Sequence, residues 1–105
     1  MKVFIIENSW IAKLAAKRLK TKTVAIVIGK TIYLHNTSKE KFLQNIYWVR
    51  HEVEHIFQFK KHGFIEFIFL YLIEHYKCGY TKNKFEIEAK EKEKNIFELN
   101  EIEFL

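Results

Sequence analysis

The chain has 105 residues and a formal net charge of +5, and 49% of its residues are hydrophobic. At about 100–200 residues per domain, this length predicts a single domain over residues 1–105, and the apolar content excludes extensive disorder. The one cysteine, Cys78, excludes an intramolecular disulfide and a cysteine-based zinc cluster, and the absence of aspartate argues against an EF-hand calcium site.

The positive charge belongs to the first half of the chain. Residues 1–50 contain ten Lys or Arg against two Glu, whereas residues 51–105 contain eight Lys against eleven Glu. A nucleic-acid interface would therefore be sought in the first half. Its basic segment, residues 13–22, contains no recognised nucleic-acid-binding module, so we interpret it as a solvated helix face and expect no nucleic-acid partner.

The first predicted elements are a helix and a β-hairpin. Polar caps at residues 8–9 and apolar residues at helical spacing predict a helix over 10–19. The continuous β-branched run 23–28 predicts a strand that is buried on both sides. A Gly-Lys turn at 29–30 then leads into a second strand over 31–35.

Three further helices are predicted in the rest of the chain. Residues 36–38 offer caps for a long helix, whose apolar positions recur at three and four residues from 42 to 57, and Gly63 interrupts it. A third helix follows over residues 64–77, and a fourth runs from a cap at Asn83 to about residue 95. The pattern predicts an α+β domain of about four helices with a small N-terminal β-hairpin or sheet.

The most apolar segment is the run over residues 64–73, which also contains Glu66. A membrane span needs about 20 apolar residues, so we expect no span. We interpret the run as a buried helix, with a membrane-surface element as the alternative. Residues 3–6 form too short an apolar stretch for a signal peptide, so the expected compartment is the cytoplasm.

His51-Glu52-Val53-Glu54-His55 is an H-E-x-x-H motif in the predicted long helix. Four residues make about one helical turn, so His51 and His55 lie on one face and can share a metal ion. Neutral imidazole nitrogen is a preferred ligand of Zn²⁺, and a catalytic zinc site keeps one position for water. Glu52 is then placed to act as general base and acid.

The third ligand has to come from elsewhere in the chain. A metzincin is excluded, because Gln58 and Lys61 occupy the positions of its glycine and third histidine. Glu86 and Glu88 on the fourth predicted helix are the remaining candidates. A projection at about 100° per residue places Glu86 nearer the apolar face, so we prefer Glu86 and keep Glu88 as the alternative.

Residues 20–93 resemble short bacterial zincin-like metallopeptidase domains of unknown function, and also the minimal gluzincins. The resemblance is carried by the segment 50–55, by Gln58 with residues 62–64, by the aromatic helix that ends at 79–80, and by the segment 83–89. The gluzincin Glu-x-x-Ala pattern maps onto Glu86 and Ala89. It implies a zinc metallopeptidase that acts on a peptide or protein. The Asp or Asn that often follows that alanine is Lys90 here, which leaves no partner there for a ligand histidine.

The expected function is therefore a zinc-dependent peptidase, with His51, His55 and Glu86 as metal ligands and Glu52 as catalytic residue. The alternative is a catalytically inactive zincin-like binding or structural module.

Three other features gain expected roles from this interpretation. The strand over residues 31–35 leads toward the metal helix, so its edge can form the rim of the site and hold an extended peptide. The tail, residues 96–105, alternates apolar and acidic residues and can form a strand on the hairpin edge that blocks the cleft. Tyr33 or Tyr80 can donate to a developing oxyanion, with a buried structural role as the alternative.

Overall fold

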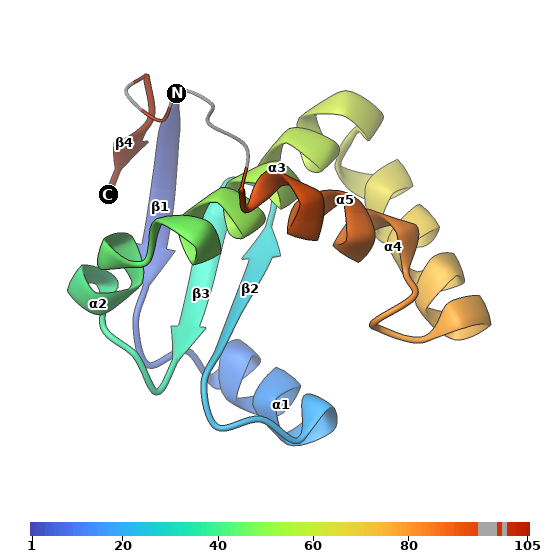
Figure 1. Cartoon of the computed structure of the whole chain (residues 1–105), viewed down its shortest axis with the longest axis horizontal. Helices are drawn as coiled ribbons and strands as arrows, with labels where there is room; N and C mark the ends of the chain where they lie inside the picture. The colour runs from blue at the N-terminus through green and yellow to red at the C-terminus, as the bar shows by residue number, and fades with distance from the viewer. Residues whose placement is uncertain (95–98, 100) are drawn as a thin grey trace.

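A four-stranded sheet at the centre of the protein carries helices on both of its faces (Figure 1). The computed structural model describes residues 1–94, 99 and 101–105. Within those residues the predicted α+β class is confirmed, with five helices where about four were expected. The elements are β1 (Lys2–Ile6), α1 (Trp10–Leu19), β2 (Val24–Ile28), β3 (Thr31–His35), α2 (Lys39–Gln44), α3 (Ile46–His62), α4 (Phe64–Cys78), α5 (Lys84–Lys92) and β4 (Glu103–Phe104).

The strands follow the order β2-β3-β1-β4 across the sheet. The predicted hairpin is confirmed: β2 and β3 pair antiparallel, and Gly29 turns between them at φ 65°. Strand β1, which pairs parallel with β3, was not predicted from the sequence. Because β1 lies far from β3 along the chain, no turn signal announces this pairing, although Val3 and Ile5 alternate with exposed neighbours as a one-sided strand requires.

Two predictions about the sheet edges are wrong. The run over 23–28 was expected to be buried on both sides, but β2 is an edge strand and is mostly half-buried. Among the described residues β2 pairs only with β3, so β2 carries the free edge. The strand over 31–35 cannot be an exposed rim, because β2 and β1 occupy both of its edges.

The tail also lies elsewhere than expected. Of the tail over 96–105, residues 96–98 and 100 lie outside the described part of the chain, and β4 is the strand that the structure describes there. It pairs parallel with β1, so it lies at the edge of the sheet opposite to β2 (Figure 1). The described part of the tail therefore does not lie on the free edge of the hairpin.

The predicted long helix is two helices, because the chain breaks at Asn45. The backbone of Asn45 leaves the helical region at φ −94° and ψ 89°, and its side-chain oxygen accepts a hydrogen bond from Trp48 N. Asn45 thus caps α3 in the way that asparagine commonly caps a helix. The preceding cap, Ser38, accepts a hydrogen bond from Lys41 N at the start of α2.

The main core lies between one face of the sheet and helices α2 and α3. Side chains alternate between the two faces of a strand and recur every 3.6 residues on one face of a helix. Alternate residues of β1 and β3 therefore pack against the apolar stripe of α3. The opposite face of the sheet carries α1, whose Ala12 and Ala16 pack near Val24. The buried members of the main core are Val3, Ile5, Ile32, Leu34, Phe42, Val49, Val53 and Ile56.

Helix α4 was expected to be a buried helix, and this prediction is wrong. Only Phe67 of its fifteen residues is fully buried, and it packs between Phe59 and Phe85. The opposite face of α4 is exposed, with Phe69 64% and Tyr76 92% accessible. None of the described helices has the length and apolar character that crossing a membrane requires.

Phe42 tests whether the main core depends on the short helix α2. Its ring is fully buried and meets Trp48 edge to face, with ring centroids 5.0 Å apart. We expect Phe42→Ala to lower the free energy of unfolding by about 3–5 kcal/mol, because it removes apolar contacts and leaves a cavity. Urea denaturation measures this value. Phe69→Ala, at an exposed position, is the control and should change it by less than about 0.5 kcal/mol.

Candidate metal centre

Helix α3 presents the H-E-x-x-H motif on the side that faces α5. The apolar stripe of α3 fixes the rotation of the helix against the sheet, because Val49, Val53 and Ile56 are all buried there. His51 and His55 then project together from an adjacent face, with ring centroids 5.1 Å apart. His55 is buried and His51 is partly exposed.

Helix α5 brings Glu86 to the two histidines. Asn83 is fully buried and caps α5: its Oδ1 accepts from Phe85 N, and its Nδ2 donates to the carbonyl of Tyr71. Gln58 of α3 donates to the carbonyl of Phe85, which fastens the first turn of α5 to the metal helix. The cap and this cross-link together set where Glu86 lies.

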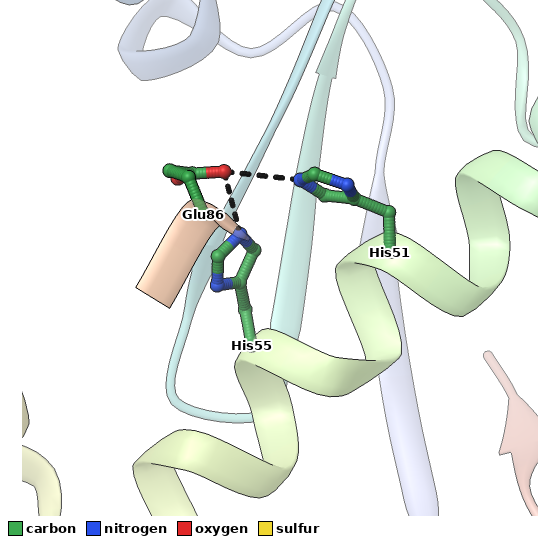
Figure 2. Close-up of side chains that lie close together, drawn as sticks. All are labelled: His51, His55 and Glu86. Carbon is green, nitrogen blue, oxygen red and sulfur yellow. Dashed lines mark hydrogen bonds and ion pairs between the residues drawn. The ribbon is translucent and has the colours of Figure 1, made fainter. Parts of the chain in front are cut away.

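The three predicted ligand side chains converge on one point (Figure 2). The distance from Glu86 Oε1 is 3.0 Å to His51 Nε2 and 3.1 Å to His55 Nε2. One ligand atom from each residue lies within 4.8 Å of the others, so the group can hold a metal ion. Ligand atoms about 2.0–2.1 Å from a tetrahedral ion stand roughly 3.3 Å apart, which the observed separations approach. The predicted grouping is confirmed.

Glu88, the alternative third ligand, lies outside this group. It is exposed on α5, and its Oε1 accepts a hydrogen bond from Gln58 Nε2. Glu86 is buried on the same helix. The choice that helical projection favoured therefore matches the structure, because the burial of Phe85 and Ala89 rotates Glu86 inward and Glu88 outward.

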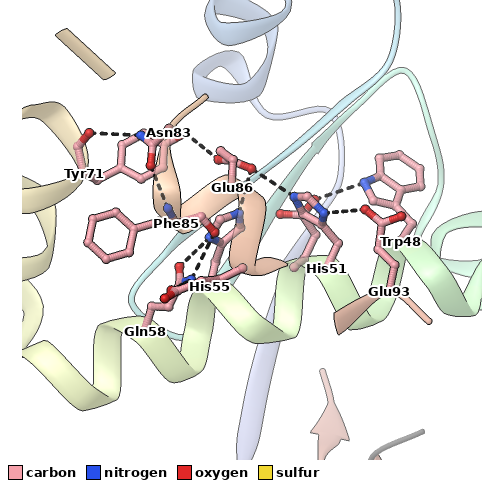
Figure 3. Close-up of polar contacts among 11 residues, drawn as sticks. Trp48, His51, His55, Gln58, Tyr71, Asn83, Phe85, Glu86 and Glu93 are labelled. Atoms are coloured by element: carbon pink, nitrogen blue, oxygen red, sulfur yellow. Dashed lines mark hydrogen bonds and ion pairs between the residues drawn. The ribbon is translucent and has the colours of Figure 1, made fainter. Parts of the chain in front are cut away.

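A second layer of hydrogen bonds orients the ligands (Figure 3). Glu93 Oε2 lies 2.7 Å from His51 Nδ1, and Gln58 Oε1 lies 2.8 Å from His55 Nδ1. Both partners offer oxygen acceptors, so each Nδ1 carries a proton, and Nε2 is the nitrogen that can give up its proton and bind a metal. Tyr71 donates its hydroxyl to Glu86 Oε2, which leaves Oε1 as the free ligand atom.

Glu93 was not found by sequence reasoning. The expected partner position after Ala89 is Lys90, which is exposed. Glu93 lies seven residues after Glu86, and a seven-residue spacing returns to nearly the same helix face, so the periodicity contained the signal. Arg50 Nη1 donates to the backbone carbonyl of Glu93 and holds this end of α5 on α3.

Glu52 is the most enclosed carboxyl group of the motif. It is 5% exposed, and its Oε2 accepts a hydrogen bond from Trp48 Nε1 at 3.1 Å. Burial raises the pKa of Glu52 to about 7, against the opposing charges of His55 and His51. A carboxyl group with a pKa near neutrality can both accept and release a proton under physiological conditions.

The electrostatics of the metal-free site follow from two imidazoles that face one carboxylate oxygen. Burial lowers the pKa of His51, but the hydrogen bond to Glu86 and the charge of Glu52 raise it more, to about 9. The pKa of His55 is raised by the same groups against a large burial effect. The pKa of Glu86 is lowered, because hydrogen bonds from both histidines outweigh its burial. In the metal-free protein, the protons on the two imidazoles therefore balance the charge of Glu86 at the place where a metal ion would bind.

A cleft of about 530 Å³ opens beside His55 and Glu86. Its lining includes β2 residues 25–28 on one side, α4 residues including Ile68 and Tyr71 on the other, and His55 and Glu86 between them. Glu52 and Tyr80 line both this cleft and a smaller cavity that reaches His51. Tyr80 is thus near the site, whereas Tyr33 packs against the cluster of α1.

No family model matches the chain, and it has no significant match among curated proteins or solved structures. The resemblance to zincin-like metallopeptidases therefore stays a prediction. The placement of the site's side chains and the chemistry of their donor atoms define it as a candidate metal centre.

The raised pKa values predict how the stability of the metal-free protein depends on pH. The folded state holds the His51 proton up to about pH 9, whereas an unfolded histidine loses it near pH 6.5, so this stabilisation is lost between those values. The raised pKa of Glu52 also makes the free energy of unfolding fall as the pH rises from about 4.5 to about 7. At about 1.4 kcal/mol per pKa unit, we expect the two effects together to lower the free energy of unfolding by roughly 4 kcal/mol from pH 6 to pH 9.

Urea denaturation in the presence of a chelator measures this profile. The matched control is zinc-loaded protein, whose stability should not fall over the same range, because the metal replaces the protons. A metal-free protein that is equally stable at pH 6 and pH 9 would contradict the proposed proton occupancy.

The role of Glu93 is tested through metal affinity. Glu93→Gln keeps the size of the side chain but weakens the acceptor on His51 Nδ1, so zinc affinity should fall about 10- to 100-fold. Competition with a chromophoric chelator measures the affinity. Glu91→Gln on the exposed side of α5 is the control and should leave it unchanged. If both variants bound zinc as tightly as the parent protein, Glu93 would have no role in metal binding.

Proposed function

We propose that this protein is a zinc-dependent peptidase with a zincin-like site. The observation that carries the proposal is the convergence of His51 Nε2 and His55 Nε2 on Glu86 Oε1, beside the buried carboxyl group of Glu52. Two imidazoles from a helical H-E-x-x-H motif and one carboxylate from a later helix are the protein ligands of the gluzincin type of catalytic zinc site.

The donor atoms favour zinc over the harder divalent cations. Ca²⁺ and Mg²⁺ prefer six or more oxygen ligands, whereas this site offers two nitrogens and one carboxylate oxygen. Three protein donors leave one tetrahedral position for water or substrate. Zinc held there would supply Lewis acidity, lowering the pKa of water and polarising a peptide carbonyl.

Glu52 performs the proton transfers in the proposed reaction. Its pKa of about 7 lets it accept a proton from the attacking water as a carboxylate and then donate that proton to the leaving amine. The hydrogen bond from Trp48 Nε1 holds one carboxyl oxygen and orients the other. Tyr80 keeps its hydroxyl proton at neutral pH, because burial and the charges of Glu86 and Glu52 raise its pKa, so it can donate to a developing oxyanion.

The proposed substrate is a peptide or protein segment in extended conformation. The cleft runs along β2, whose outer edge has no strand partner among the described residues. Unpaired backbone groups on such an edge can bind an extended segment by main-chain hydrogen bonds. This edge belongs to β2, whereas the sequence pattern had predicted a substrate on β3.

Metal content is the first test of this proposal. After chelation and reconstitution, we expect about one equivalent of zinc per chain, and both His55→Ala and Glu86→Ala should reduce the affinity by at least about 100-fold. Inductively coupled plasma mass spectrometry measures the stoichiometry. His35→Ala, a histidine of β3 outside the ligand group, is the matched control. Less than half an equivalent in the parent protein would refute the zinc site.

Catalysis is tested separately with Glu52→Gln. This change keeps zinc but removes the group that accepts and donates the proton, so kcat/KM on a general peptide library should fall by about 10²–10⁴. Glu54→Gln, on the same helix but outside the ligand group, should retain activity. Full zinc occupancy with no cleavage by the parent protein would instead identify the chain as an inactive zincin-like binding or structural module.

A further inference from the structure

Helix α4 exposes an apolar stripe that nothing in the described chain covers. The exposed residues fall at positions i, i+4, i+7, i+8 and i+11, which lie within about 100° of one face. Their accessibility ranges from 48% at Ile73 to 92% at Tyr76. Fully exposed apolar stripes are unusual on a monomer and indicate an interaction surface. The stripe consists of Ile65, Phe69, Leu72, Ile73 and Tyr76.

Helix α1 carries a second exposed surface of a different composition. Trp10 is 71% exposed and Leu14 is 54% exposed on its outer face. Three exposed cationic side chains surround these two residues: Lys13, Lys17 and Arg18. Helix α1 contains no acidic residue. Tryptophan flanked by long cationic side chains is the composition that favours the boundary between lipid headgroups and acyl chains.

Both surfaces border the same cleft. Arg18 and Leu19 of α1 line it together with Leu72 and His75 of α4. Figure 1 shows α1 and α4 on the β2 side of the sheet, away from β4. The apolar stripe of α4 and the cationic face of α1 are therefore two rims of one opening.

We infer that these two rims dock on the surface of an anionic phospholipid bilayer. The stripe of α4 supplies apolar side chains that can enter the boundary of the acyl region. The cations of α1 supply the attraction to anionic headgroups, about 1 kcal/mol for each Lys or Arg near the surface. Neither helix crosses the bilayer, in agreement with their lengths of ten and fifteen residues.

Charge decides between a lipid surface and a second copy of the chain. A symmetric dimer through both rims would bring the cationic face of α1 toward its own copy or leave it unpaired. An anionic surface complements that face and covers the apolar stripe at the same time. Three of the ten basic residues in residues 1–50, those on α1, then have a role that nucleic-acid binding did not give them.

Docking in this way places the mouth of the cleft at the membrane surface. Combined with the proposed peptidase function, on which this consequence rests, it directs the site toward peptide segments bound to the membrane. Lipid binding itself requires no catalysis, so its failure and the failure of the peptidase proposal are separate outcomes.

Vesicle sedimentation with the full chain tests the inference. We expect the protein to bind vesicles of phosphatidylcholine with phosphatidylserine, to bind vesicles of phosphatidylcholine alone much less, and to lose binding as salt increases. The double variant Lys13→Gln/Lys17→Gln should weaken binding by at least about tenfold. Phe69→Ser and Tyr76→Ser should each weaken it by a similar factor, because they remove apolar side chains from the stripe.

The controls use residues of the same kind on α5 and just after it. Lys90→Gln/Lys94→Gln removes two exposed cations, and Ile87→Ser removes an exposed apolar side chain, so both should bind as the parent protein does. Thermal unfolding confirms that each variant is folded. Binding that ignores lipid charge, or that the control variants weaken equally, would overturn the inference. A dimer that Phe69→Ser dissociates, without vesicle binding, would overturn it in favour of a second copy.

Discussion

The site depends on one constraint: α5 has to lie against α3 so that a single carboxylate oxygen faces two imidazole nitrogens. Glu86 Oε1 lies 3.0 Å and 3.1 Å from the two Nε2 atoms, in surroundings that are largely buried. Burying a carboxylate costs several kcal/mol unless charges and hydrogen bonds compensate. The compensation comes from the histidines and the hydroxyl of Tyr71, so α4 also contributes to the same centre. The helices of the second half of the chain are thus organised around one charged group.

The same helix serves the core and the site, which explains how a small chain contains both. Val49 and Val53 of α3 pack on the sheet, while His51 and His55 project from the neighbouring face toward α5. Because side chains in a packed core have little freedom, the sheet fixes the rotation of α3 and thereby the direction of both imidazoles. A loss of core packing would consequently displace the ligands, although no ligand belongs to the core.

Features that depend on neighbouring residues were predictable from the sequence, and features that depend on distant segments were not. The i,i+4 histidines, the turn at Gly29 and the inward position of Glu86 all follow from local periodicity, and the structure agrees with them. The pairing of β1 with β3 and the edge position of β2 arise from contacts far apart in the chain, which periodicity does not encode. Asn45 illustrates a third case, because an apolar pattern can continue through a capping residue that ends one helix and begins another.

The exposure of α4 shows why composition alone misjudged that helix. Its sequence is apolar almost all round, which is typical of a helix buried on every side. A domain of this length has little core to share, and α2 and α3 already cover one face of the sheet while α5 packs on α3, so α4 can bury Phe67 and little else. The remaining apolar side chains stay on the outside, next to the cleft that contains the ligands. Apolar side chains kept at the mouth of a site lower solubility without adding to the core, and such an arrangement is expected where the mouth itself makes contact with another surface.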